Sequence, residues 1–430
     1  MSADKVIPPQ TKERPPTLTT LPNEILEQIV KRVNATKDHY SLSLVSRVCY
    51  RTVTPHLWRV LAPTYLKTLS IIVNNVGKKG PLLSFNSLFD CVKEIDLSKA
   101  LIYDTEPSTV FEKLILQCHN LEALDMTNCL WLKDEHTTPL INCTKLKRVN
   151  FHGCAALKGY KLPLLTQSLL KLEWLSLAFC DHLEELEPVF EDCRAPLKHI
   201  DLSGVHDLDD MNRAVRLLFT RCVNTLEEFR VMFNGKLDAS GFAILADKTP
   251  PIKRFTLSHC TQIQDDTLYA LHPIAPQLEV ITLSQMDQVT SQAIVDFIRK
   301  AHNLQRLDLS AMDLMTDEGI DEILHTCINI QHLTLNGSRT KYTDTTLYSV
   351  AAHLPRLKHF GMIYNEQITL EAVKVLVGSC GQLEELRLTG CKNLKGGWLT
   401  RLVTTFEEDG DLFFKGREEV RRISGADGVL

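Results

Sequence analysis

The sequence has no apolar run near the length of about 20 residues that a membrane span needs, and its start, MSADKVIPPQ, lacks the apolar core of a signal peptide. It contains no glycine-rich phosphate loop, no His-Glu-x-x-His, no Gly-x-Ser-x-Gly and no Cys-x-x-Cys pair. A net charge of -5 over 430 residues gives no global attraction to nucleic acid or anionic membranes. These absences predict a soluble, non-enzymatic protein of the cytoplasm or nucleus, without a metal site and without membrane or nucleic-acid partners.

What the chain does contain is a repeat, in which apolar residues occupy the first, fourth and sixth positions of a short predicted strand. This signature recurs every 25 to 29 residues, beginning at Val92, Leu121, Leu146, Leu172, Leu197, Leu226, Ile252, Leu278, Leu304, Ile330, Leu357 and Leu383. A period of about 20 to 29 residues with this signature is that of a leucine-rich repeat. We therefore predict an α/β horseshoe solenoid of about twelve repeats over residues 92–406, with parallel strands on the concave face and helices on the convex face.

The copy that begins at Leu304 shows how one repeat is built. Leu304, Leu307 and Leu309 point inward from the strand, and Thr316 is placed to cap the following helix. A thirteenth, degenerate strand is predicted at Leu66, within a linker over residues 63–91. A short helix near residues 398–403 is expected to close the core, before a charged tail over residues 407–430.

Eleven of the thirteen cysteines follow the same period. Five of them, Cys129, Cys154, Cys180, Cys260 and Cys391, fall eight residues after a repeat start, and six more fall three or four residues before the next one. A small apolar residue that recurs at fixed phases of a solenoid is a packing residue. The pattern resembles the cysteine-containing subclass of leucine-rich repeats found in F-box proteins.

The region before the repeats has a different composition. Residues 1–17 are rich in proline and polar residues, which predicts a disordered leader. Residues 18–62 then give three short amphipathic helices, the second through Leu42, Val45, Val48 and Cys49, and the third through Val53, Leu57 and Trp58.

These helices carry the segments LPNEILEQIV, LSLVSRVCYR and HLWRVL, which together resemble the F-box. The resemblance implies binding to a Skp-type adaptor, and through it to cullin and RING subunits. The residues that it places in the contact are Leu21, Pro22, Ile25, Leu26, Leu44, Val45 and Trp58. We assign Ile29, Val33 and Val48 instead to the core of the helical unit.

An F-box followed by cysteine-type leucine-rich repeats resembles the F-box and leucine-rich repeat substrate receptors of Skp–cullin–F-box ubiquitin ligases. The resemblance implies a non-catalytic subunit that selects a protein for ubiquitination and ubiquitin-dependent degradation. A second possibility is a non-degradative interaction scaffold, and the sequence does not separate the two. No cofactor is expected.

The target is expected on the concave face, which the third, fifth and seventh positions of each repeat line. Most residues there are small or polar, Asp308 among them, and are expected to contribute little. Repeats three to seven differ, because arginines and large apolar residues share neighbouring strands or the adjoining rim: Arg148, Trp174, Phe179, Arg230, Met232, Phe233 and Arg254. We predict that Trp174 is the apolar anchor, and that Arg230 and Arg254 bind an acidic or phosphorylated target, although Phe179 and Phe233 could equally pack back onto their loops.

Overall fold

The computed structural model describes residues 21–33, 36–75, 88–100, 107–206, 208–337, 342–394, 413–417, 420 and 423. They belong to two compact units, Met1–Ala123 and Leu124–Leu430. No helix among these residues is both long enough and apolar enough to cross a membrane.

The first unit begins with three helices and continues with two short parallel strands. Its elements are α1 (Asn23–Arg32), α2 (Thr36–Ser43), α3 (Arg47–Leu57), β1 (Val60–Leu61), α4 (Leu66–Asn75), the 3₁₀ helix η2 (Leu88–Cys91), β2 (Glu94–Asp96) and α5 (Pro107–Ile115). Helix α3 starts at Ser46, whose hydroxyl accepts a hydrogen bond from the Cys49 backbone N–H. Leu26 and Val30 of α1 and Cys49 and Val53 of α3 are buried, and they form the core of the helical part.

Two boundaries in this unit differ from the sequence prediction. The second and third helices are separated by a turn at Leu44 and Val45, so the segment that we predicted to end one helix begins the next. The segment from Leu66, predicted as a degenerate strand, is helix α4, and the extra strand is instead β1, whose Val60 pairs with Glu94 of β2. An apolar-x-x-apolar pattern fits one face of a helix as well as it fits a short strand, so the pattern alone did not distinguish the two.

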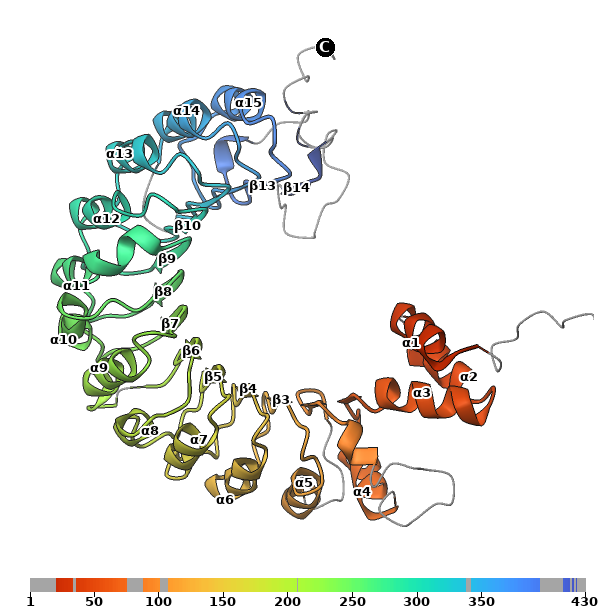
Figure 1. The fold of residues 1–430 in the computed structure, drawn as a ribbon. Helices are drawn as coiled ribbons and strands as arrows, with labels where there is room; N and C mark the ends of the chain where they lie inside the picture. The colour runs from red at the N-terminus through yellow and green to blue at the C-terminus, as the bar shows by residue number, and fades with distance from the viewer. Residues whose placement is uncertain are drawn as a thin grey trace, which may run out of the picture. The chain divides into compact units, whose positions relative to one another are not determined.

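The second unit repeats a strand and a helix along the chain. Its strands are β3 (Ala123–Asp125, starting at the last residue of the first unit), β4 (Arg148–Asn150), β5 (Trp174–Ser176), β6 (His199–Asp201), β7 (Glu228–Met232), β8 (Arg254–Ser258), β9 (Val280–Ser284), β10 (Arg306–Asp308), β11 (His332–Thr334), β12 (His359–Gly361), β13 (Glu385–Arg387) and β14 (Phe413–Lys415). Strands β4 to β13 pair in parallel in chain order, with equal repeat phases opposite each other, such as Arg148 opposite Trp174 and His332 opposite His359. Within this unit the strands lie along the inner side of a curved array and the helices along its outer side (Figure 1).

The helical segments of this unit vary in length more than the strands. They are α6 (Asp134–Thr137), η3 (Thr138–Asn142), α7 (Leu162–Ser168), α8 (Glu187–Glu191), α9 (Met211–Arg221), α10 (Ala239–Phe242), η4 (Ala243–Ala246), α11 (Asp265–Ala270), η5 (His272–Gln277), α12 (Ser291–Ile298), α13 (Asp317–Thr326), α14 (Asp344–His353), α15 (Leu370–Ser379) and η6 (Lys392–Leu394). The predicted cap of α13 is confirmed, since the Thr316 side chain accepts a hydrogen bond from the Gly319 N–H at 3.1 Å.

The core of the array contains the residues that the repeat pattern placed there. Leu304, Leu307 and Leu309 are fully buried, and so are their counterparts in neighbouring repeats. The packing role of the cysteines is also confirmed by burial, and several thiols donate to a carbonyl of the preceding repeat, as Cys154 does to Met126 O at 3.1 Å. Burial raises the pKa of Cys143 to about 11, which keeps this thiol protonated at neutral pH.

At the fifth position of several repeats an aspartate or asparagine closes the turn that follows the strand. Asp308 Oδ1 accepts from the Ser310 N–H at 2.9 Å and from its hydroxyl at 2.5 Å, and Asp125 binds Thr127 in the same way. These side chains therefore shape the backbone of the turn, and the small contribution of Asp308 to target binding stays a prediction.

At the C-terminal end, β14 pairs with β13 in the antiparallel direction, and Leu386 lies opposite Phe414. The sequence placed residues 413–415 in a charged tail, whereas they add a strand to the sheet of this unit. The predicted closing helix at residues 398–403 lies outside the described residues.

Candidate protein-binding surfaces

The helical part of the first unit exposes large apolar side chains at several of the F-box-like positions. Ile25 is 43% exposed, Leu44 69% and Val45 52%. Pro22 directly precedes α1 and is also exposed, while its carbonyl accepts from the Ile25 and Leu26 backbone N–H groups. Leu44 and Val45 form the turn between α2 and α3.

Other residues of the same unit differ from the sequence assignment. Leu26 was placed in the adaptor contact, but it is fully buried and belongs to the core, because it occupies the inner face of α1 together with Val30. Val48 was placed in the core, but it is 38% exposed in the first turn of α3. Leu21 and Trp58 are half-buried. Tyr40, which we did not single out, is exposed on α2.

On the concave face of the second unit, Trp174 lies at the start of β5 and is half-buried. The guanidinium of Arg148, on the neighbouring strand β4, lies 5.5 Å from the centre of its ring. A cation over an indole face is attracted by the negative potential of the ring. The two residues that we expected near each other therefore form one stacked pair, which leaves part of the indole accessible.

The arginines of the next two strands are held by acids that sequence analysis did not consider. Glu228 Oε2 accepts from Arg254 Nε at 2.7 Å and lies 3.0 Å from His199 Nδ1, and Glu228 Oε1 accepts from Arg230 Nη2 at 3.2 Å. Arg230 also approaches Asp201, with Nη1 at 3.9 Å from Oδ2.

These contacts determine the charge of the cluster formed by Glu228, Arg230, Arg254 and His199. Burial alone would raise the pKa of Glu228, but the hydrogen bonds from Arg254 and His199 and the nearby positive charges outweigh burial and lower it. Glu228 is therefore ionised at neutral pH and neutralises part of the positive charge. Arg230 and Arg254 both already bind Glu228, and their binding to an acidic or phosphorylated target stays a prediction.

Large side chains form a row along the rim where the strands end. The ring centres of His152 and Phe179 are 5.1 Å apart, those of Phe179 and Phe233 6.1 Å, and those of Phe233 and His259 4.2 Å. Phe179, Phe233 and His259 occupy the eighth repeat position, where the backbone is left-handed, with φ of 54° to 55°. Phe233 remains 40% exposed, and Met232 next to it is half-buried. The two phenylalanines are thus packed along the rim and still present apolar surface.

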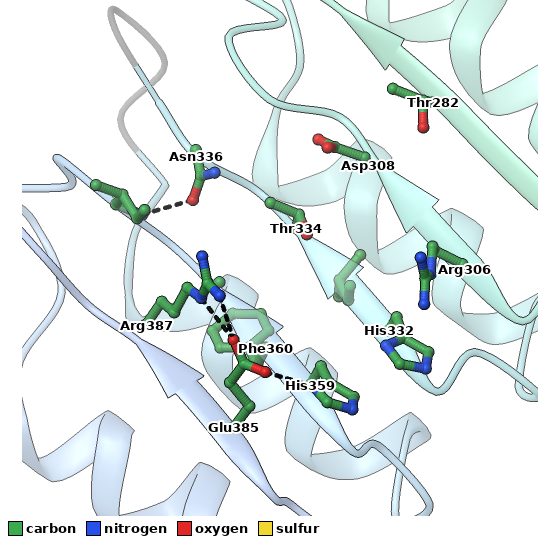
Figure 2. A pocket seen from close by; sticks show the side chains of 13 residues that line it. Thr282, Arg306, Asp308, His332, Thr334, Asn336, His359, Phe360, Glu385 and Arg387 are labelled. Atoms are coloured by element: carbon green, nitrogen blue, oxygen red, sulfur yellow. Dashed lines mark hydrogen bonds and ion pairs between the residues drawn. The ribbon is translucent and has the colours of Figure 1, made fainter. Parts of the chain in front are cut away.

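A pocket of about 440 Å³ lies on the concave face of the C-terminal repeats, across strands β9 to β13, outside the repeats that we favoured. Figure 2 shows its polar side chains, with His332 and His359 on neighbouring strands and Arg306 beside His332. The ionisable residues that line it are Arg306, Asp308, His332, His359, Glu385 and Arg387. The sequence contained one sign of it, since histidines occupy the third position of consecutive repeats.

The pocket combines neutral and ionised groups. The rings of His332 and His359 stack at 4.2 Å with an angle of 9° between their planes. Burial, followed by the neighbouring His359, lowers the pKa of His332 to about 4, so this ring is neutral at pH 7. Glu385 joins the two sides, because it lies 2.9 Å from His359 Nδ1 and accepts from Arg387 Nε at 2.6 Å.

The surfaces described above belong to the helical part of the first unit and to the concave side and rim of the second unit. They offer an apolar patch, a stacked Trp–Arg pair and a polar pocket with flat rings, which together suit the side chains of a protein partner.

No family model matches the chain. Among solved structures, a chain in the crystal structure of the Rad7 and Elc1 complex in yeast is similar to it with a TM-score of 0.61 and 16% identity, over 90% of this chain and 91% of that chain. An internalin of Listeria monocytogenes has a TM-score of 0.41 at 13% identity, over 87% of this chain and 93% of that one. A leucine-rich repeat protein of Leptospira interrogans has a TM-score of 0.40 at 14% identity, over 75% and 84%.

The repeat period, the parallel strands in register and the outer helices make the second unit a leucine-rich repeat solenoid. The predicted fold class is thereby confirmed. The chain is a repeat protein, with a helical unit before the solenoid.

Proposed function

We propose that this protein is the substrate-recognition subunit of a Skp–cullin–F-box ubiquitin ligase. In this proposal the first unit binds a Skp-type adaptor, and the concave face of the second unit binds the target protein. The observation that carries the proposal is the exposure of Pro22, Ile25, Leu44 and Val45, which are F-box-like positions, on one small helical unit.

Exposed apolar side chains are unfavourable in water, and a partner that covers them stabilises the complex. Covering a large aliphatic side chain contributes about 1.5–3 kcal/mol. Ile25, Leu44 and Val45 keep about half or more of their surface in water, so a partner that covers them gains about half to two thirds of this energy for each side chain. Apolar side chains gathered on a small unit are typical of a docking surface.

The comparison with solved structures agrees with a role in an assembly. The similar yeast structure is that of a complex between two proteins, Rad7 and Elc1. An architecture with a helical unit and a solenoid provides separate surfaces for an adaptor and for a target. The chemistry of ubiquitin transfer would then belong to other subunits, in the cytoplasm or the nucleus, and this chain would be non-catalytic.

The first test is binding of the full chain to a recombinant Skp-type adaptor, measured by calorimetry. Leu21→Ala combined with Pro22→Ala should abolish binding, because the two residues shape the exposed start of α1. Leu44→Asp should weaken binding by at least about 30-fold, the equivalent of about 2 kcal/mol at a buried anchor. Leu170→Asp is the matched control, because Leu170 is 63% exposed in the second unit and should leave adaptor affinity unchanged.

The circular dichroism spectrum of each variant should match that of the wild type, since these positions lie outside the core. Adaptor binding that survives both variants would refute the proposed contact. A reconstituted ligase that binds a captured partner but transfers no ubiquitin to it would favour the scaffold alternative instead.

A further inference from the structure

On the outer side of the second unit, two histidines and an aspartate meet between neighbouring helices. Asp321 and His325 are one turn apart on α13, and His353 is the last residue of α14. The Nδ1 atom of His325 lies 3.4 Å from Asp321 Oδ2, and the Nε2 atom of His353 lies 3.7 Å from Asp321 Oδ1. The two imidazole ring centres are 4.0 Å apart. One potential ligand atom from each residue lies within 4.8 Å of the other two.

These separations suit a single small metal ion. Zinc binds imidazole nitrogen and carboxylate oxygen at about 2.0–2.2 Å, and in tetrahedral geometry such ligand atoms lie about 3.4 Å from each other. The distances from the Asp321 carboxylate to His325 Nδ1, 3.4 Å, and to His353 Nε2, 3.7 Å, are close to that value. Small side-chain rotations would therefore bring all three ligands onto one ion.

The donor set selects the kind of ion. Two imidazoles with one carboxylate favour Zn²⁺ and its borderline neighbours over Mg²⁺ or Ca²⁺, which prefer oxygen ligands. We propose that Asp321, His325 and His353 bind one divalent ion of the zinc class that bridges α13 and α14. The fourth position is open to water, because His325 is exposed and the other two residues are half-buried.

A buried neighbour supports the site from behind. The hydroxyl of Ser349, which is 7% exposed, donates a hydrogen bond to Asp321 Oδ1 and so orients the carboxylate. His325 Nδ1 lies 2.8 Å from the backbone carbonyl of Asp321, and this hydrogen bond is exchanged for the metal bond. Metal binding at Nδ1 therefore requires the neutral tautomer of His325 that carries its proton on Nε2.

The position of the site gives it a structural consequence. Helix α13 follows β10 and α14 follows β11, so the ion would join the two repeats whose strands carry Arg306 and His332 of the concave pocket. A metal bond across the outer side would restrain the spacing of these strands. No sequence motif revealed this metal site, because His353 is 28 residues from His325 and belongs to the next repeat.

The test is titration of the full chain, free of any histidine tag and kept reduced, with ZnSO₄ by calorimetry and with CoCl₂ by absorption. The wild type should bind one ion per chain, and the cobalt spectrum should lack a thiolate charge-transfer band. His325→Gln, His353→Gln and Asp321→Asn should each lower affinity by at least about tenfold. His302→Gln is the matched control, since His302 is exposed in the loop before β10 and outside the cluster.

Thermal unfolding provides a second readout. Zinc at about 100 times its dissociation constant should raise the midpoint of the wild type by about 3 °C, and that of His325→Gln by less. Because His325 is exposed, its variant keeps the fold even if the half-buried His353 does not tolerate change. Equal affinity in the wild type and in the His325→Gln variant, or a thiolate band with cobalt, would overturn the site.

Discussion

Gly204, at the rim of the sixth strand, provides the sharpest test of how neighbouring repeats fit together. Its backbone is left-handed, with φ at +65°, and a Cβ atom at this position would lie 2.4 Å from Cδ1 of Phe179. Two more atoms of that ring would lie within 2.9 Å. Phe179 belongs to the preceding repeat, so the ring of one repeat rests directly on the glycine of the next.

The cost of Gly204→Ala follows from these two features. A residue with a Cβ pays about 1–2 kcal/mol in the left-handed region. Displacing a packed ring costs about 1–3 kcal/mol, and the lower entropy of the unfolded chain returns about 0.5–1 kcal/mol. Gly204→Ala should therefore lower the free energy of unfolding by about 1–4.5 kcal/mol.

The assay is urea unfolding followed by circular dichroism. Gly378→Ala is the matched control, because Gly378 is exposed in α15 and no atom lies within 4 Å of the added Cβ, so this change should be neutral or stabilise by up to about 1 kcal/mol. In a Phe179→Ala background no ring has to be displaced. Gly204→Ala should then lower the free energy of unfolding only by the cost of a Cβ in the left-handed region, about 1–2 kcal/mol. A Gly204→Ala protein as stable as the wild type, or a cost unaffected by Phe179→Ala, would show that the ring does not rest on the glycine as described.

Three further predictions concern the concave face. Trp174→Ala should weaken binding of a captured target by more than about tenfold, measured by calorimetry, while changing stability little; unchanged affinity would move the site to the C-terminal pocket. Asp308→Ala should destabilise the protein by about 1–2 kcal/mol in urea, because the two hydrogen bonds to Ser310 are lost, whereas Asp308→Asn should retain most of the stability; equal effects would exclude the turn role. The folded-state pKa of His332, about 4, lies below the unfolded value of 6.5, so the folded state binds fewer protons between these values and stability should fall as pH decreases from 6.5 to 4. His332→Gln should flatten this pH dependence of the unfolding midpoint, and an unaltered slope would contradict the low pKa.

The sequence by itself determined the repeat and its core. The spacing of Leu304, Leu307 and Leu309 is a local property of a strand, and the recurrence of the same spacing requires equal units that stack. The phase of Cys154 and its counterparts follows from the same period, and burial confirms it. Whether a residue is buried could therefore be predicted from its position within the repeat. Every repeat buries the same positions, and it does so with side chains that are close together in the chain.

Only the tertiary structure decided which side chains of adjacent repeats contact one another. Arg254 and Glu228 lie 26 residues apart, and His353 and His325 lie 28 apart, yet each pair meets because neighbouring repeats stack in register. The same stacking placed Phe179 on Gly204 and the two pocket histidines face to face. In the helical unit, Leu26 and Leu44 both fit the F-box pattern, but one is buried and the other exposed. A pattern records which residues are apolar, whereas the packing of one element on the next determines which of them remain available to a partner.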